Sequence, residues 1–199
     1  MTKFDEALSY LSDNDPFLDK VIKIINLQDK KKSNDEFTSL VKIIIGQQLS
    51  GTAARTIVNR LNKLLGEKNY NPQTIAKFSN EELRSCGLSN GKSSYVRGLA
   101  EILIVNPKYF ENLKKIDEVN ILNELCKIRG VGIWTASIFA MSSLGYENIF
   151  PYGDASLNKA IKNLYNDEFD QEVIISKWSP YKSYACRVLW QWVDKGMPK

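Results

Sequence analysis

Two short stretches of the chain combine residue types that could do chemistry. The first, KIRGVGIWTAS at 127–137, places Gly130 and Gly132 between segments with a helical pattern. Glycine inside a helix costs roughly 1 kcal/mol against alanine, so the pair indicates a turn in which both glycines take positive φ. Exposed amides at the start of the next helix could then hold a phosphate oxygen, and Thr135 could add a hydroxyl contact. A plain turn that allows close helix packing would also explain the glycines.

The second stretch is IFPYGDASL at 149–157, where a loop with proline and glycine leads to Asp154 at the start of a predicted helix. Aspartate is among the best N-terminal caps, and capping alone could account for it. The helix dipole and the amide donors also favour the charged carboxylate. A fixed anion close to a phosphate site repels DNA, but it stabilises positive charge that develops during a reaction. We therefore treat Asp154 as a candidate catalytic residue.

Several kinds of chemistry are excluded or disfavoured by composition. The 199 residues include no histidine, which excludes histidine acid–base chemistry, Ser-His and Cys-His nucleophiles and most zinc catalysis. Cys86, Cys126 and Cys186 show no paired spacing, so we expect no metal site and a reduced cytoplasmic setting. The N-terminal residues do not form a secretion signal, and no apolar run approaches the ~20 residues that span a bilayer. We expect no membrane partner, and the net charge of +4 permits a polyanionic one.

The elements that must position these residues are helices. Apolar residues recur at intervals of three and four along almost the whole chain, and alternating strand patterns are scarce. We predict an all-α fold of about ten short helices. They include segments at 118–128, 133–143, 155–165 and 181–193. We expect two lobes, one from 46–125 and one from 1–45 plus 126–199, with a DNA groove between them.

Four segments in chain order carry a family resemblance. They are IIIGQQLSGTAARTIVNRL at 43–61, CGLSNGKSSYVRGLA at 86–100, IRGVGIWTASIFAM with FPYGDASL within 128–157, and WSPYKSYACRVLWQW at 178–192. Together they resemble the helix-hairpin-helix (HhH-GPD) DNA glycosylases, and the first and last are similar to the alkylbase, or 3-methyladenine, DNA glycosylase II branch. The resemblance implies a two-lobed multi-helix fold without the N-terminal β domain of larger members. It also implies a monomer that acts on damaged double-stranded DNA, with nucleoid association.

The resemblance implies specific contacts with DNA. The amides of Gly130 and Gly132 would grip a backbone phosphate, with a bridging monovalent cation as an option and no other cofactor. Lys92 would lie near another phosphate. Gln48 or Leu49 would fill the space that a flipped nucleotide vacates, although ordinary packing at a helix end would explain these two residues about as well.

The resemblance also implies a catalytic centre. Asp154 would face C1′ of the flipped nucleotide and stabilise charge on the sugar. Aromatic residues would surround a cationic base, and the candidate base-pocket residues are Trp134, Trp190, Tyr152 and Ile138. Core packing is the commoner explanation for a tryptophan on an apolar face, and Ile138 stands where the best-known bacterial relatives have tyrosine, which affects substrate range.

Two departures from the superfamily narrow the expected reaction. Members that also cut the strand carry a lysine two residues after the second hairpin glycine, where this chain has Trp134, so no Schiff base can form there. Cys186 is not part of a four-cysteine cluster motif, so no iron–sulfur cluster is expected. The resemblance thus implies a monofunctional glycosylase that releases alkylated purines such as 3-methyladenine and 7-methylguanine and leaves an abasic site. A glycosylase for an oxidised or deaminated base remains an alternative, as does a non-catalytic DNA-binding module, which the presence of Asp154 disfavours.

Overall fold

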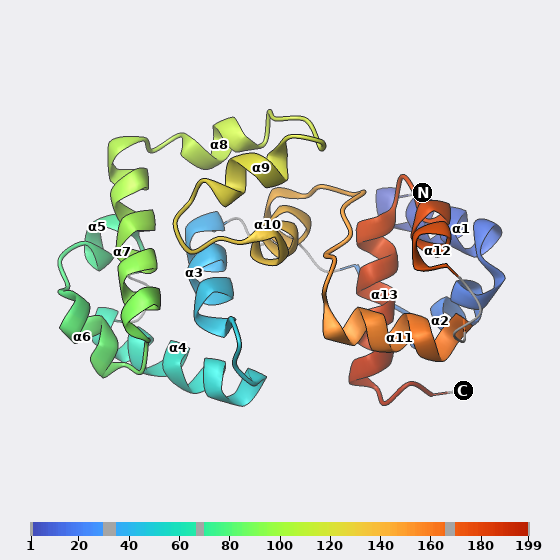
Figure 1. The fold of residues 1–199 in the computed structure, drawn as a ribbon, viewed down its shortest axis with the longest axis horizontal. Helices are drawn as coiled ribbons and strands as arrows, with labels where there is room; N and C mark the ends of the chain where they lie inside the picture. Colours follow the sequence, from blue (N-terminus) through green and yellow to red (C-terminus); the bar gives the residue numbers. More distant parts are fainter. Residues whose placement is uncertain (1, 30–34, 67–69, 166–169, 199) are drawn as a thin grey trace. The chain divides into compact units, whose positions relative to one another are not determined.

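The computed structural model describes residues 2–29, 35–66, 70–165 and 170–198. Within these ranges the chain forms thirteen α-helices and one π-helical turn, and it contains no strand (Figure 1). The all-α fold predicted from the sequence is confirmed.

The chain divides into two compact units. We call residues 33–144 the central unit and residues 1–32 with 145–199 the terminal unit. These boundaries differ from the expected ones near 46 and 125. The helix Glu36–Gly46 and the helices around Gly130 pack with the central segment, because the apolar face of the former is buried against its neighbours there. Each unit is described by itself.

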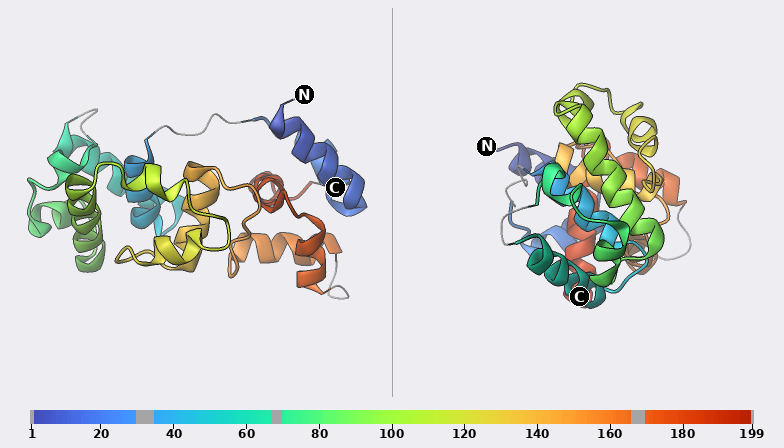
Figure 2. Two further views of the ribbon diagram at one scale, coloured as in Figure 1. Left: turned by 90° about the horizontal axis from the view of Figure 1, so that it is seen from above. Right: turned by 90° about the vertical axis from the view of Figure 1, so that its left-hand side faces the viewer.

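The central unit is built around α3, Glu36–Gly46. Leu40, Val41 and Ile44 on this helix have no exposed surface, and α3 packs against α4, α7 and α10. The long helix α7 packs in turn against α5 and α6 (Figure 2). The remaining elements of this unit are α4 (Gly51–Leu65), α5 (Pro72–Ile75), α6 (Asn80–Ser85), α7 (Asn90–Val105), α8 (Tyr109–Leu113), α9 (Ile121–Cys126), α10 (Ile133–Phe139) and the π-helical turn η1 (Ala140–Leu144).

The terminal unit combines helices from both ends of the sequence. The C-terminal helix α13 packs against α11, α2 and α1. Its buried residues include Cys186, Val188 and Leu189, which have no exposed surface. The bounds are α1 (Lys3–Asn14), α2 (Pro16–Ile25), α11 (Ala155–Tyr165), α12 (Gln171–Lys177) and α13 (Lys182–Asp194).

Asp15 connects these segments through buried hydrogen bonds. Its Oδ1 accepts the N–H groups of Phe17 and Leu18, each at 3.1 Å, and so caps α2. Its Oδ2 accepts the Tyr165 hydroxyl and the Trp178 indole N–H, the latter at 2.8 Å. A carboxylate with four donors is tolerated in a site where only 2% of the residue is exposed. Asp15 therefore joins α2 to the end of α11 and to the residue that follows α12.

The predicted helices differ from the observed ones mainly at their ends. The expected helix at 118–128 is the shorter α9, because the Asp117 side chain accepts the Asn120 N–H at 2.9 Å and forms a turn before it. The expected helix at 133–143 changes to π-helical geometry at Ala140. The helix predicted at 155–165 matches α11.

Candidate functional site

Gly130 is required by both its backbone and its surroundings. Its φ is +87°, in the region that L side chains rarely adopt. A Cβ built on this residue would lie 2.2 Å from the ring of Tyr95 on α7. The positive φ predicted at this position is confirmed, and the close approach of Tyr95 adds a second reason that the sequence did not reveal.

Gly132 is different, and the positive φ predicted there is wrong. Its φ of −90° and ψ of 175° are open to any residue. A Cβ built on it meets no atom within 4 Å. Gly132 is the N-cap of α10, and no side chain forms a cap hydrogen bond with this helix. Neither the backbone nor packing within the protein therefore demands glycine here, whereas close approach of an external group to the backbone would.

Gln47 holds the hairpin in place. Its side-chain Nε2 donates to the Gly130 carbonyl and to the Thr135 hydroxyl oxygen, both at 2.9 Å. Thr135 is 4% exposed, so its hydroxyl lies inside the protein rather than at the surface. Sequence reasoning missed Gln47. The available signal was a polar residue directly after the apolar run of α3, within the GQQLS segment.

Lys92 supports the turn between α3 and α4. Its Nζ donates to the carbonyls of Ile45 at 2.8 Å and Gln47 at 2.6 Å, and burial lowers the pKa of Lys92. The amine is thus engaged within the protein, and its expected contact with a phosphate stays a prediction.

The turn that Lys92 supports presents two exposed residues. Gln48 has a φ of +55°, a conformation that costs a non-glycine residue about 1–3 kcal/mol. Gln48 is exposed, and Leu49 is 40% exposed. This exposure disfavours the alternative that the two residues merely pack at a helix end. Their role in filling a DNA gap stays a prediction.

Trp134 and Ile138 share one face of α10, because residues four apart in a helix are neighbours on its surface. Trp134 is 36% exposed and Ile138 is partly exposed. Core packing therefore does not account fully for Trp134. Trp134 lies two residues after Gly132, on the first turn of α10.

Asp154 is held at the N-terminus of α11 in the terminal unit. Its Oδ1 accepts the Leu157 N–H at 2.9 Å and the Trp190 indole N–H at 3.2 Å. The turn before it requires Gly153, whose φ is +82°. Asp154 is only 8% exposed, so these donors keep the carboxylate in one orientation. It is a helix cap, as the pattern indicated, and it is also in contact with a predicted base-pocket residue.

The surroundings of Asp154 come from α13. Cys186 and Trp190 lie one helical turn apart on this helix. Burial and the nearby Asp154 carboxylate raise the pKa of the Cys186 thiol well above its ordinary value, so a neutral group lies beside the acid. Tyr152 is 50% exposed, and its hydroxyl donates to Glu172 Oε2 at 3.0 Å. Burial and Glu172 together raise the pKa of Tyr152.

The predicted site residues fall into two groups. The central unit carries Gln48, Leu49, Lys92, Gly130, Gly132, Trp134, Thr135 and Ile138, and the terminal unit carries Tyr152, Asp154 and Trp190. Within the residues that the structure describes, no group of three or more His, Cys, Asp or Glu is placed to hold a metal ion. None of the described helices has the length and apolar character needed to cross a bilayer.

Comparisons with known proteins bear on the family and the fold of the chain. A family model described as "HhH-GPD superfamily base excision DNA repair protein" matches residues 41–177. The putative DNA-3-methyladenine glycosylase YfjP of Bacillus subtilis is 30% identical over 169 residues, which cover 79% of this chain and 59% of the relative, so the chain spans about three fifths of its length.

Two solved structures share the fold. A DNA-3-methyladenine glycosidase from Bacillus halodurans superposes with a TM-score of 0.78 at 29% identity, over 96% of this chain and 89% of that one. The Schizosaccharomyces pombe 3-methyladenine DNA glycosylase Mag1, solved in complex with abasic DNA, superposes with a TM-score of 0.82 over 98% and 99% of the two chains. At 21% identity the latter likeness speaks for the fold alone.

Proposed function

This chain belongs to the HhH-GPD superfamily of base excision DNA repair proteins, and from that membership we propose that it is a DNA glycosylase. The proposed substrate is an alkylated purine such as 3-methyladenine or 7-methylguanine in duplex DNA. The proposed reaction is hydrolysis of the N-glycosidic bond by a monomer, which leaves an abasic site. The names of the relatives support this substrate class.

The observation that carries the proposal is the fixed carboxylate of Asp154. As the C1′–N bond breaks, its electron pair leaves with the base and positive charge grows on the sugar. A preorganised carboxylate stabilises that charge without reorganising during the reaction. The Leu157 amide and the Trp190 indole orient Asp154 for this task. Water then adds to C1′, and its proton passes to the carboxylate or to solvent.

The open backbone at Gly132 supports a grip on DNA. The start of α10 has no side-chain cap, and helix N-termini favour anions. A phosphate held there would position the duplex without reading its sequence. A monovalent cation bound to hairpin carbonyls could supplement the amides, and the proposed chemistry requires no other cofactor.

An exposed indole supports recognition of a cationic base. A flipped alkylated purine already carries positive charge, and such a cation over a tryptophan face gains about 0.5–2 kcal/mol. Trp134 offers such a face on α10. The charge on the base also makes it a good leaving group, which is compatible with a chain that lacks histidine.

The residue at position 134 also bears on strand cleavage. A lyase needs an amine that attacks C1′ and forms a Schiff base. Trp134 has no such amine two residues after Gly132. We therefore propose a monofunctional enzyme that releases the base and leaves both strands intact.

Base release tests this function directly. The protein is incubated with duplexes that contain 3-methyladenine, 7-methylguanine, hypoxanthine or 8-oxoguanine, and the free base is measured. We expect release of the two alkylated purines and loss of that release in Asp154→Asn with DNA binding retained. Borohydride should trap no covalent complex with the wild type. Full activity of Asp154→Asn would contradict the mechanism, and release of 8-oxoguanine alone would contradict the substrate class.

A further inference from the structure

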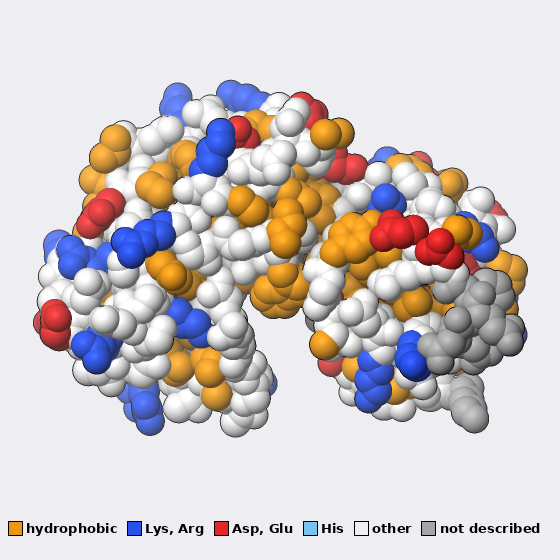
Figure 3. Space-filling view, viewed as in Figure 1, with side chains coloured by type: hydrophobic (Ala, Val, Ile, Leu, Met, Phe, Trp, Pro, Cys, Tyr) orange, Lys and Arg blue, Asp and Glu red, His pale blue; other side chains and the backbone are white. Residues whose placement is uncertain are grey.

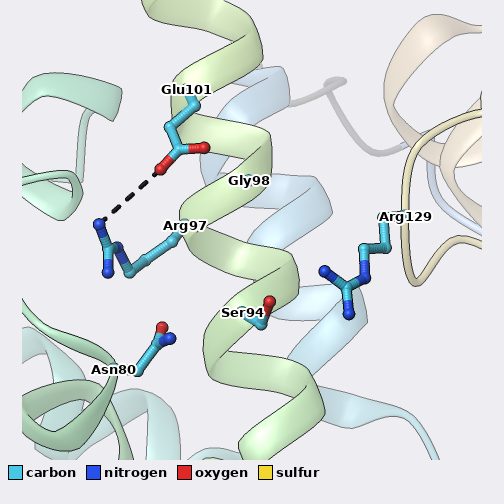
Figure 4. A pocket seen from close by; sticks show the side chains of 6 residues that line it. All are labelled: Asn80, Ser94, Arg97, Gly98, Glu101 and Arg129. Carbon is cyan, nitrogen blue, oxygen red and sulfur yellow. Dashed lines mark ion pairs between the residues drawn. The ribbon is translucent and has the colours of Figure 1, made fainter.

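A polar pocket of about 320 Å³ lies on the central unit, outside the residues discussed so far. Figure 4 shows that Arg97 extends outward from one side of α7, whereas Arg129 reaches toward the other side of this helix from the hairpin loop, and Ser94 and Gly98 lie on the helix. A Cβ built on Gly98 meets nothing within 4 Å. The surface of α7 at Gly98 therefore carries no side chain and is open to a ligand. The pocket is lined by Asn80, Ser94, Arg97, Gly98, Glu101 and Arg129.

The pocket contains buried polar atoms that have no partner among the described residues. Arg97 Nε is a buried donor without an acceptor, and Asn80 Oδ1 is a buried acceptor without a donor. Such atoms cost free energy unless a ligand or water satisfies them. Arg97 pairs with Glu101 only at 3.8 Å, and the Glu101 side chain is 63% exposed. Arg97 Nε thus has spare capacity for a hydrogen-bond acceptor, whereas Asn80 Oδ1 requires a donor, which a water molecule beside the ligand can supply.

The charges identify the kind of ligand. Two arginines and one glutamate leave the pocket with one net positive charge. Guanidinium groups match phosphate oxygens through paired N–H donors. The face of the central unit in Figure 3 also carries Lys and Arg side chains over the region of α4 to α7. A phosphate is the ligand that suits this combination of donors and charge.

The position of Arg129 identifies the source of the phosphate. Arg129 directly precedes Gly130, and its guanidinium carbon lies 5.9 Å from the centre of the Tyr95 ring, which packs on that glycine. The pocket therefore borders the start of the hairpin turn. A DNA strand held at Gly132 would bring a neighbouring phosphate close to Arg129 and Arg97.

We propose that this pocket is a second anchoring site for the DNA backbone. It binds the backbone of the duplex flank on one side of the flipped nucleotide, with Arg97 and Arg129 on either side of α7 as phosphate ligands, and it takes no part in the chemistry. This inference rests on the proposed function for its partner, DNA. It adds a site that determines how much flanking duplex the protein needs.

Binding to undamaged duplex at several salt concentrations tests the site. Arg97→Gln should weaken binding roughly threefold to tenfold and reduce the slope of log K against log salt by about 0.9, the value for one lost phosphate contact. Glu101→Gln should strengthen binding, because Glu101 is the acidic residue among the described residues that line the pocket. Arg84→Gln on α6, an exposed arginine outside the pocket, is the matched control and should change the slope far less.

Two further experiments vary the length of the duplex and measure the binding of inorganic phosphate. Shortening one flank of the duplex should abolish the difference between wild type and Arg97→Gln, whereas shortening the other flank should preserve it. Equal slopes for Arg97→Gln and Arg84→Gln would overturn the proposal even if base release is normal. Arg97-dependent binding of inorganic phosphate, without any effect on DNA binding, would overturn it as well. If duplex binding and its dependence on salt are as expected but no base is released, the proposed function is contradicted and the proposed phosphate site is retained.

Discussion

Asp15 and Asp154 occupy similar local settings in the terminal unit. Each caps the N-terminus of a helix, each is buried, and each accepts an indole N–H. They differ in what surrounds them. Asp15 is 2% exposed and ties together three segments of the chain, whereas Asp154 is 8% exposed and follows the half-exposed Tyr152 in its loop.

This difference shows that capping geometry alone does not identify a catalytic acid. The donors of Asp15 come from the start of α2, the end of α11 and the residue after α12, so its hydrogen bonds join separate elements. Asp154 also accepts hydrogen bonds from two helices, α11 and α13, but it lies at the end of a loop that Gly153 shapes and that carries the half-exposed Tyr152. We infer that Asp15 contributes to stability and Asp154 to reaction, and five substitutions test this division.

Asp154→Asn should have the largest effect. We expect base release to fall by roughly 10²–10³-fold, because the amide cannot stabilise a developing cation as the carboxylate does. The amide oxygen can still accept the Leu157 N–H, so the melting temperature should change little. Single-turnover base release and a thermal melt on the same sample measure both quantities, and a large loss of stability with unchanged release would reverse the assignment.

Asp15→Asn should give the opposite result. We expect the free energy of unfolding to fall by roughly 2–4 kcal/mol, because the buried donors of Tyr165 and Trp178 lose a charged acceptor. Urea unfolding measures this change. Base release per folded molecule should match the wild type at a temperature where the variant is folded, and a catalytic loss comparable to that of Asp154→Asn would break the comparison.

The two tryptophans provide a matched pair, since Trp→Phe keeps an aromatic ring and removes the N–H donor. Trp178→Phe should lower the free energy of unfolding by roughly 2–3 kcal/mol, because Trp178 is fully buried and its bond is to a charged group. Trp190→Phe should cost about 1 kcal/mol of stability or less and slow base release about tenfold. If the two substitutions changed the free energy of unfolding and the rate of base release equally, the distinction between Asp15 and Asp154 would be wrong.

Alkaline pH should produce the smallest effect. Burial and the Asp15 charge raise the pKa of Tyr165 above its ordinary value. Because the pKa of Tyr165 is raised in the folded protein, the stabilisation from this residue is complete below about pH 10, the pKa of tyrosine in an unfolded chain. Above that pH the free energy of unfolding falls by up to about 1.4 kcal/mol per pH unit. Tyr165→Phe should therefore lose stability more slowly than the wild type between pH 10 and 11 in urea unfolding. Burial also raises the pKa of Tyr70, to about 12, but this contribution is common to both proteins and cancels. Parallel curves would show that Tyr165 ionises normally.

Local features of the fold could be predicted from sequence. The Ser50 hydroxyl accepts the Ala53 N–H at 3.3 Å, and Ser79 with Glu82 forms a capping box. Such caps depend on residues two to four positions apart, which the sequence displays directly. The spacing of apolar residues at three and four, which predicts helices, also depends only on neighbouring positions.

The contacts that shape the candidate site depend on residues far apart in the sequence. Gln47 reaches Gly130 and Thr135 across more than 80 positions, and Lys92 reaches Gln47 across 45. No periodicity signals such pairs. The unit boundaries also lay elsewhere than expected, because the apolar face of α3 does not reveal which helices cover it. At Gly132, only the packed structure shows that the space beyond the backbone is open.

The Gln47 side chain has a consequence for the spacing of the two points that are proposed to contact DNA. It joins the tip that bears Gln48 and Leu49 to the hairpin that begins α10, so these two points keep a constant separation. In the proposed complex with DNA, the protein therefore sets the distance between the residue that fills the gap and the phosphate at the hairpin before DNA binds. Helices of the wrong pitch would fail to fit that interval, whatever base they contain.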